Sequence, residues 1–275
     1  MVEVLFISKI LVSILVVVGL SAIAERVSPK VAGILSGYPL GTAISLFFIG
    51  IENGVDFATH ASVFTLSGLT ASLTLVFGYY HASRVTAHLS LPVSVFISVL
   101  ASVSVFLSIG FGLSKLPLGL ISGFVLCAVA IVVFTLLFRP IQNTLVTAKV
   151  RFTRWVLLVR SLAAAGMVLL ITGVAEWAGS SLAGILAAFP ITLFPFLVIM
   201  HLTYGAAQAH TVIKNYPLGI GALITYVISV SFAYPALGIG LGTLVSFGFA
   251  TLYLMVFYFI NQRLRDVKSL KVKRS

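Results

Sequence analysis

Apolar runs, each long enough to cross a lipid bilayer as a helix, recur along the whole of this chain. A helix needs about 20 predominantly apolar residues to span the hydrocarbon core. Of the 275 residues, 60% are hydrophobic and only 8% are charged, and the mean hydropathy is +1.19. A water-soluble domain of this size could not cover its surface with so few polar residues. The sequence therefore predicts an all-α, polytopic helical membrane protein.

We predict nine membrane spans with short connections between them. They cover approximately residues 4–24, 31–51, 60–81, 91–113, 117–138, 155–175, 181–202, 209–234 and 236–260. With the N-terminus outside, this division places thirteen of the 17 Lys and Arg residues on the inner side and Lys115 alone on the outer side. Because positive charge accumulates in cytoplasmic loops, we expect the N-terminus outside and the C-terminus inside.

One phrase occurs twice in the chain. "AERVSPKVAGILSGYP" (24–39) and "AEWAGSSLAGILAAFP" (175–190) share seven of sixteen positions without a gap. The same offset of 151 residues aligns Lys9 with Arg160 and Gly54 with Gly205. It carries the first four predicted spans onto the last four and leaves the fifth as a connector. An odd number of spans then separates equivalent helices, so we expect an inverted repeat of four, one and four helices.

This repeat divides the chain into four parts. They are a first four-helix unit (1–113), a connector helix with a cytoplasmic loop (114–154), a second, inverted four-helix unit (155–262) and a basic cytoplasmic tail (263–275). Inverted repeats with interrupted helices are the usual architecture of secondary transporters. The alternative is a duplication that only stabilises the fold.

Each copy of the phrase ends in a proline inside an apolar run. Proline removes a backbone donor and frees a carbonyl of the preceding turn, and such a group must be satisfied within protein or in a wet cavity. Gly/Pro-interrupted helices at matching positions of two halves point to a binding site near the bilayer midplane. The predicted substrate-binding residues are Gly37, Tyr38, Pro39, Ala188, Phe189 and Pro190. The alternative is that these small residues only let helices pack closely.

Two basic residues lie inside predicted spans, and each would be costly in contact with lipid. Because the first and sixth spans are expected to be antiparallel, we predict that Lys9 pairs with Glu176 on the outer side and Arg160 with Glu25 on the inner side. These pairs could act as alternating gates or as static locks. Alternatively, the basic side chains extend to the nearest interface.

Other chemistry is sparse in the sequence. There is no Cys/His cluster with metal-ligand spacing, no phosphate-binding glycine loop and no nucleophile motif, so we expect neither an enzyme nor a resident cofactor or metal. The lone cysteine, Cys127, fits a small residue in an apolar core. His60, His201 and His210 lie near span ends and are expected at the interface. A coupling H⁺ would use Glu25, Glu176 or the histidines, and Na⁺ would use freed carbonyls at the kinks.

The pattern Ala-Gly-[Ile/Leu]-x-x-x-[Tyr/Phe]-Pro, after a helix with an early Lys or Arg, resembles the small four-helix GlpM-type membrane proteins. Residues 32–39 and 183–190 both match this spacing, as do Lys9 and Arg160. The resemblance covers mainly the first two helices of each half and implies a tandem, inverted pair of such units. The first half departs from the pattern in having Gly41, not Thr, after Pro-Leu. The resemblance implies an architecture and carries no catalytic residue.

The function predicted first is secondary transport of a small solute, which Lys9 and Arg160 would make anionic, with a site between the kinked spans two and seven. The alternatives are a non-transporting accessory protein for export of an envelope polymer, and a channel. The expected location is the cytoplasmic membrane of a prokaryote, as a multi-pass protein. Its partners would be membrane lipid, which the basic tail would contact, and the solute, without nucleic acid. The sequence leaves the oligomeric state open.

Overall fold

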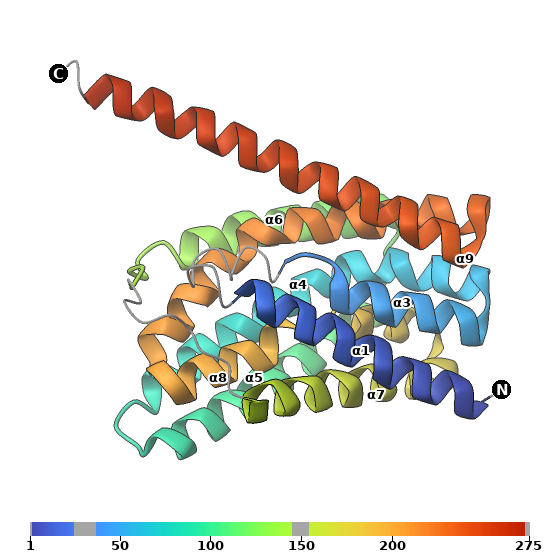
Figure 1. The fold of residues 1–275 in the computed structure, drawn as a ribbon, viewed down its shortest axis with the longest axis horizontal. Coiled ribbons are helices and arrows are strands. Elements are labelled where there is room, and N and C mark those ends of the chain that lie inside the picture. The colour runs from blue at the N-terminus through green and yellow to red at the C-terminus, as the bar shows by residue number, and fades with distance from the viewer. Residues whose placement is uncertain (1, 25–36, 145–153, 273–275) are drawn as a thin grey trace.

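The computed structural model describes residues 2–24, 37–144 and 154–272, and every regular element within these ranges is a helix (Figure 1). The helices are α1 (Val2–Ala24), α3 (Leu40–Asn53), α4 (Val55–Val85), α5 (Leu91–Ser114), α6 (Leu120–Leu137), α7 (Arg154–Ala187), α8 (Leu193–Tyr204) and α9 (Ala206–Val272). Within these ranges α4, α5, α6, α7 and α9 are long and apolar enough to cross a membrane. The chain is therefore an integral helical membrane protein of several spans.

The helix boundaries differ from a simple series of nine spans. The predicted span 181–202 is broken, because α7 ends at Ala187 and α8 begins only at Leu193, after Pro190. The predicted spans 209–234 and 236–260 form the two limbs of α9, which meet at a kink at Gly238 (φ 74°, ψ 175°). Residues 31–36 of the predicted second span lie outside the described residues. The count of nine and the direction of each span in the membrane stay predictions.

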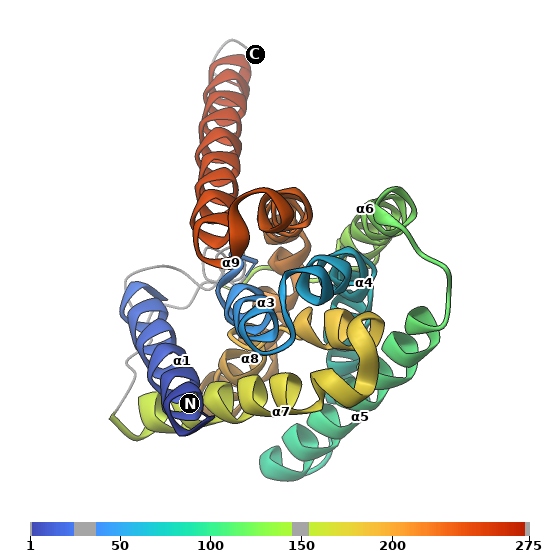
Figure 2. The same ribbon diagram turned by 90° about the vertical axis from the view of Figure 1, so that its right-hand side faces the viewer.

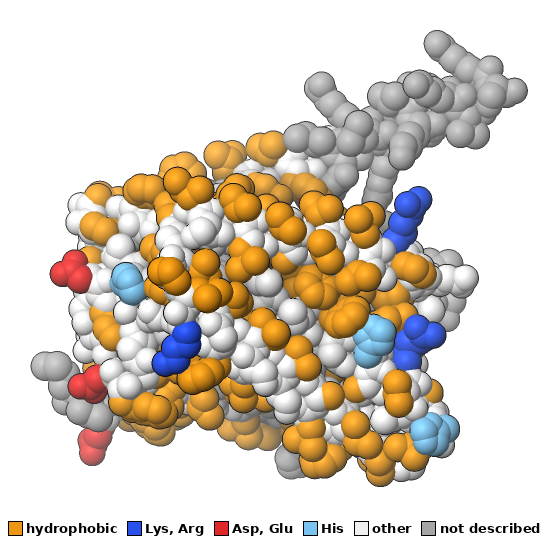
Figure 3. Space-filling view, turned by 180° about the vertical axis from the view of Figure 1, so that it is seen from behind, with side chains coloured by type: hydrophobic (Ala, Val, Ile, Leu, Met, Phe, Trp, Pro, Cys, Tyr) orange, Lys and Arg blue, Asp and Glu red, His pale blue; other side chains and the backbone are white. Residues whose placement is uncertain are grey.

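Helix α4 lies at the centre of the bundle and packs against α5, α6, α7 and α9 (Figure 2). Most of its side chains are buried, including Leu66, Leu69 and Leu73. Helices α5 and α6 instead expose apolar side chains such as Phe96 and Ile121, and apolar side chains spread over the face seen in Figure 3. Acidic side chains lie at one end of that face. This distribution suits a bundle whose sides contact hydrocarbon and whose ends contact water.

Helices α1 and α7 pack side by side and run in opposite directions (Figure 1). The outward face of α1 carries exposed apolar side chains, among them Phe6, Leu11 and Leu15. Its inward face carries Lys9, which is only 5% exposed. The basic residue of this span therefore faces protein and not lipid, as its desolvation cost requires.

The same backbone geometry recurs at positions 151 residues apart. Gly54 joins α3 to α4 with φ 90° and ψ 169°, and Gly205 joins α8 to α9 with φ 89° and ψ 174°. The N–H of Gly54 donates to the carbonyl of Gly50, and the N–H of Gly205 donates to the carbonyl of His201. Ala58 and its counterpart Ala209 are both fully buried. Equivalent sequence positions thus form equivalent turns.

The two prolines of the repeated phrase also have matching surroundings. Leu40 N–H donates to the Tyr38 carbonyl, and Ile191 N–H donates to the Phe189 carbonyl, each at 2.8 Å. One turn later, the carbonyls of Pro39 and Pro190 accept bonds of 2.8 Å from Ala43 and Phe194, respectively. Each proline therefore stands at the start of a short helix, where its missing N–H costs nothing.

We expect Gly54→Ala and Gly205→Ala each to destabilise the protein by about 1–3 kcal/mol, because their backbone region is essentially restricted to glycine. Thermal unfolding of the purified variants in detergent measures the loss. Gly112→Ala is the control, since Gly112 lies inside α5 with nothing within 4 Å of an added Cβ. Equal stability of the three variants would contradict the assignment of these turns.

Candidate functional site

A small cavity lies between the starts of α3 and α8. Helix α3 contributes Gly41 and Thr42, the break between α7 and α8 contributes residues 188–192, and α9 contributes Tyr216 and Leu223, while Tyr38 completes the lining. The enclosed space of about 10 Å³ is just enough for one water molecule. The two segments approach closely here, because a Cβ added to Gly41 would lie 3.0 Å from Cβ of Ile191.

Four of the six predicted substrate-binding residues line this cavity: Tyr38, Ala188, Phe189 and Pro190. The Tyr38 hydroxyl lies 2.8 Å from the Thr251 hydroxyl, which connects the start of α3 to the second limb of α9. The Phe189 ring packs edge-on against Phe106, with ring centroids 5.2 Å apart. Aromatic residues thus flank the cavity from both halves of the chain.

Gly37 and Pro39 lie beside the cavity and do not line it. Both are buried. A Cβ added to Gly37 would lie 2.2 Å from the carbonyl carbon of Gly219 in α9, so this glycine is required for the backbones to approach. The close-packing alternative therefore describes Gly37, while Tyr38, the next residue, lines the cavity.

Two hydroxyl groups of α4 donate hydrogen bonds to carbonyls that are freed near the break between α7 and α8. Thr65 donates to the Gly184 carbonyl at 2.9 Å, and Ser72 donates to the Ala188 carbonyl. The carbonyls of Ile185 and Leu186 accept the N–H groups of Ala188 and Phe189 (3.0 and 2.9 Å). The break is thus satisfied within protein, as its depth in an apolar bundle demands.

Tyr216 is a residue of this cavity that sequence reasoning missed. It is fully buried in α9 and lines the cavity beside Thr192. Its hydroxyl has no hydrogen-bond partner within the described part of the chain. The sequence offered one signal for Tyr216: it directly precedes Pro217, a proline in the interior of α9.

The prediction that Lys9 pairs with Glu176 is wrong. The Lys9 ammonium lies 2.5 Å from the Glu52 carboxylate and donates to the Thr172 hydroxyl at 2.6 Å, while Glu176 is exposed. Thr172 lies one turn before Glu176 on α7, so the depth expected from antiparallel packing was nearly right. Glu52, near the end of α3, therefore takes the place predicted for Glu176.

Arg160, the counterpart of Lys9, is 2% exposed. Its guanidinium carbon lies 5.2 Å from the centre of the Phe196 ring in α8. The predicted partner Glu25 lies outside the described residues, so the second pair stays a prediction. Burial of both basic residues disagrees with the alternative in which they extend to an interface.

The expectation that the three histidines lie at the interface fails for His201. Its side chain is 2% exposed, and Nδ1 lies 3.1 Å from the Tyr79 hydroxyl of α4. His210 is half-buried, with Nε2 2.8 Å from the Ser83 hydroxyl, whereas His60 is exposed. Tyr79 and Ser83 lie four positions apart on one face of α4, which holds both histidines inside one end of the bundle.

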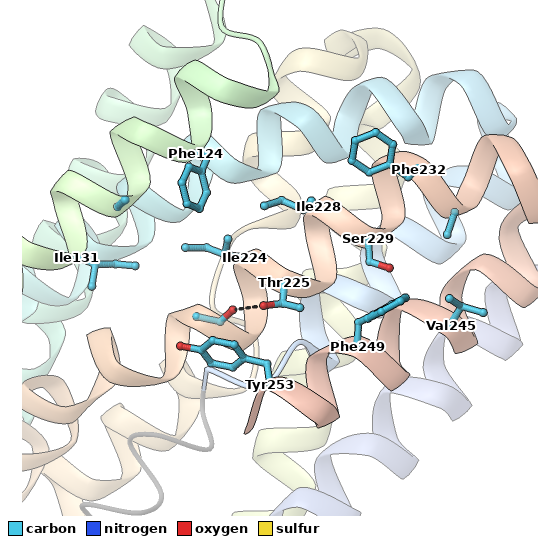
Figure 4. A pocket seen from close by; sticks show the side chains of 13 residues that line it. Phe124, Ile131, Ile224, Thr225, Ile228, Ser229, Phe232, Val245, Phe249 and Tyr253 are labelled. Carbon is cyan, nitrogen blue, oxygen red and sulfur yellow. Dashed lines mark hydrogen bonds between the residues drawn. The ribbon is translucent and has the colours of Figure 1, made fainter. Parts of the chain in front are cut away.

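A larger groove lies between α6 and the two limbs of α9 (Figure 4). It measures about 770 Å³ and is lined mainly by apolar side chains such as Phe124, Ile228 and Phe249. The Thr225 hydroxyl in it already donates to the Gly221 carbonyl at 2.8 Å. None of the predicted site residues lines this groove, and its lining offers few polar groups for orienting a solute.

No protein-family model, curated protein or solved structure matches this chain. The resemblance to GlpM-type proteins therefore stays a prediction from the repeated motif.

Proposed function

We propose that this protein is a secondary transporter of a small polar solute, with its site at the cavity where α3 meets the break between α7 and α8. In this proposal the chain is an inverted repeat of two four-helix units with α6 as the connector. The matching turns at Gly54 and Gly205 support the repeat. The opposite directions of α1 and α7 support the inversion, as do α3 and α8, which extend from the middle of the bundle toward opposite ends (Figure 1).

The observation that carries the proposal is the meeting, in the protein core, of the start of α3 and the break between α7 and α8. Discontinuous helices at a repeat interface are where secondary transporters bind substrate. Because the two units are equivalent, rocking about such a point can open the site toward either side of the membrane at similar free energy. The cavity of about 10 Å³ holds at most one water, and the lack of a wide pore at this point favours a carrier over a channel.

The distribution of charges supports the proposed orientation. Arg84 and Arg139 lie at the ends of α4 and α6 that we assign to the cytoplasm, whereas Glu52 and Asp56 flank the turn at Gly54. The positive-inside rule then supports the predicted orientation, with the N-terminus outside and the C-terminus inside. The cytoplasmic membrane of a prokaryote remains the proposed location. The tandem GlpM-type interpretation fits the same orientation, with each unit contributing one interrupted helix.

Reconstitution in liposomes tests the function. A panel of radiolabelled small carboxylates, phosphate and amino acids should include a solute that shows saturable uptake and counterflow. An ionic current across planar bilayers without counterflow would instead indicate a channel. The absence of both counterflow and current would indicate the accessory role. A current without counterflow, or the absence of both activities, would contradict the proposal.

We expect Thr192→Val to slow the uptake about fivefold, since it removes one hydroxyl from the cavity while keeping the side-chain shape. Thr225→Val is the matched control, because Thr225 lines the apolar groove instead. Initial rates in liposomes measure both variants. Equal loss in the two variants, or loss only in Thr225→Val, would remove the cavity as the transport site.

A further inference from the structure

Resting on the proposed function, we infer that His201 and His210 form a proton-binding site that opens the end of the carrier assigned to the cytoplasm. The ligand is H⁺, and the cavity between α3 and α8 faces this end when the histidines are protonated. Three properties support the assignment: the hydrogen bonds of the two histidines, the charges around them and their position relative to the cavity.

The two histidines connect the two halves of the chain at one end of the bundle. They lie on either side of the turn at Gly205, one in the last turn of α8 and the other near the start of α9. Nδ1 of His201 lies 3.1 Å from the Tyr79 hydroxyl. Nε2 of His210 lies 2.8 Å from the Ser83 hydroxyl. Both hydroxyls are buried and belong to α4, so these contacts hold α8 and α9 of the second half against the first half.

The hydrogen bonds of Ser83 assign the proton-binding atom of His210. Its hydroxyl donates to the Tyr80 carbonyl at 3.0 Å. A hydroxyl has one proton, so the Ser83 oxygen accepts the N–H at Nε2 of His210. Because a neutral imidazole carries a single N–H, Nδ1 is the atom of His210 that binds a further proton.

Protonation of His201 would disrupt its contact with α4. Tyr79 is 0% exposed, and in the described part of the chain its hydroxyl has no other hydrogen-bond partner than Nδ1 of His201. A buried hydroxyl needs an acceptor, so Tyr79 donates to this nitrogen. A proton bound at Nδ1 would remove the acceptor and leave the Tyr79 proton unsatisfied, which disfavours the closed arrangement.

The charged groups around the two histidines are basic. Arg84 follows Ser83 on α4, and Arg84 and His201 both act on His210 electrostatically. Within the described part of the chain, neither histidine forms an ion pair with Asp or Glu, and acidic side chains lie at the opposite end of the face shown in Figure 3. The other ionisable groups on the described elements at this end are Tyr80, His81, His88, Arg139, Arg160, Tyr204 and Lys214, and α5 carries none. Two added positive charges would therefore repel each other and Arg84 without a carboxylate to compensate them.

Helix α8 connects this end of the bundle with the cavity. It begins at Leu193, directly after Thr192 of the cavity lining, and its 12 residues extend roughly 18 Å to Tyr204. Release of the two histidines from α4 would let the turn between α8 and α9 move away from the first half and open the cavity toward this end. Because proton binding favours the open form, opening also favours proton binding.

Maleimide labelling of the full chain in detergent tests the inference without requiring transport. Ala209→Cys and Ala207→Cys are made separately in a Cys127→Ala background. Ala209 is fully buried beside His210, whereas Ala207 is exposed. The ratio of their labelling rates corrects for the effect of pH on the reactivity of the thiol itself. Between about pH 8 and about pH 5.5, where histidine titrates, this ratio should rise about tenfold.

The double variant His201→Asn/His210→Gln has no histidine to protonate, while its amide groups can replace the hydrogen bonds of Nδ1 and Nε2. Its labelling ratio should not change with pH. His60→Asn is the matched control, because His60 is exposed and contacts the Ser180 hydroxyl (2.7 Å) at the other end of the bundle. This control should show the same rise as the chain with all histidines.

A constant ratio in the chain with all histidines would overturn the inference, and this result requires no histidine variant. An equal rise in the double variant, or loss of the rise in His60→Asn, would overturn it as well. Counterflow in liposomes together with a constant ratio would contradict the proton site and leave the proposed function standing. A rising ratio without counterflow would support the proton site and contradict only transport.

Discussion

Replacing Gly184 by alanine is expected to destabilise the protein by about 3 kcal/mol or more, at the upper end of overpacking in a core. A Cβ on Gly184 would lie 2.0 Å from the backbone oxygen of Ala61 and 2.8 Å from its carbonyl carbon. Backbone atoms cannot move aside as a flexible side chain can, so α7 would have to separate from α4. That separation would also lengthen the bond from Thr65 to the Gly184 carbonyl.

Gly173→Ala on the same helix is the matched control. Gly173 has nothing within 4 Å of an added Cβ, so alanine there should be neutral or stabilise the helix by up to about 1 kcal/mol. Thermal unfolding of both purified variants in detergent, followed by size-exclusion chromatography, measures the difference. If Gly184→Ala were as stable as Gly173→Ala, the close crossing of α4 and α7 would be wrong.

Lys9→Met is expected to destabilise the protein by about 2–4 kcal/mol. Breaking a buried ion pair leaves an uncompensated charge, which costs about 3–5 kcal/mol when both groups are fully buried. The Lys9 side chain is 7% exposed but that of Glu52 is 28% exposed, so water can solvate the remaining carboxylate and reduce the cost. The Thr172 hydroxyl also loses its donor.

The double variant Lys9→Met/Glu52→Gln should recover part of this loss, because no isolated charge remains. Adding Glu176→Gln to Lys9→Met should recover nothing, since Glu176 is exposed and lies apart from the pair. Lys115→Met at the exposed end of α5 serves as the control for removing a lysine. Recovery with the Glu176 change instead of the Glu52 change would contradict the pairing. Thermal unfolding of the five proteins provides the comparison.

The sequence was most informative about local structure. Hydropathy predicted an integral helical membrane protein, and five long apolar helices in the described part of the chain confirm it. The 151-residue offset aligned Gly54 with Gly205, and the two glycines have the same unusual dihedral angles. Pro39 and Pro190 were predicted to interrupt helices, and α3 and α8 begin just after them. Glycine and proline dictate backbone geometry by themselves, so their effects can be predicted without knowledge of tertiary contacts.

Partners across helices could not be predicted in the same way. Depth along an antiparallel pair indicated Glu176 for Lys9, but the lateral distance between helices decides the contact, and it favours Glu52. His201 was expected at an interface because it lies near the end of a span. It is buried, and Tyr79 of α4 lies against it, with the Tyr79 hydroxyl 3.1 Å from Nδ1 of His201. Tyr216 was missed because only the fold brings α9 against the starts of α3 and α8.

The inverted arrangement of the two halves is the central claim, and the sidedness of the two equivalent turns tests it most directly. Asp56 and Ala207 are equivalent positions two residues after Gly54 and Gly205, and both are exposed. Single cysteines, Asp56→Cys and Ala207→Cys, are placed in a Cys127→Ala background, since Cys127 is the only cysteine and is buried. Intact cells are then treated with a membrane-impermeant maleimide. The account predicts labelling at position 56 and protection at position 207 until the membrane is opened, whereas labelling of both or of neither in intact cells would contradict it.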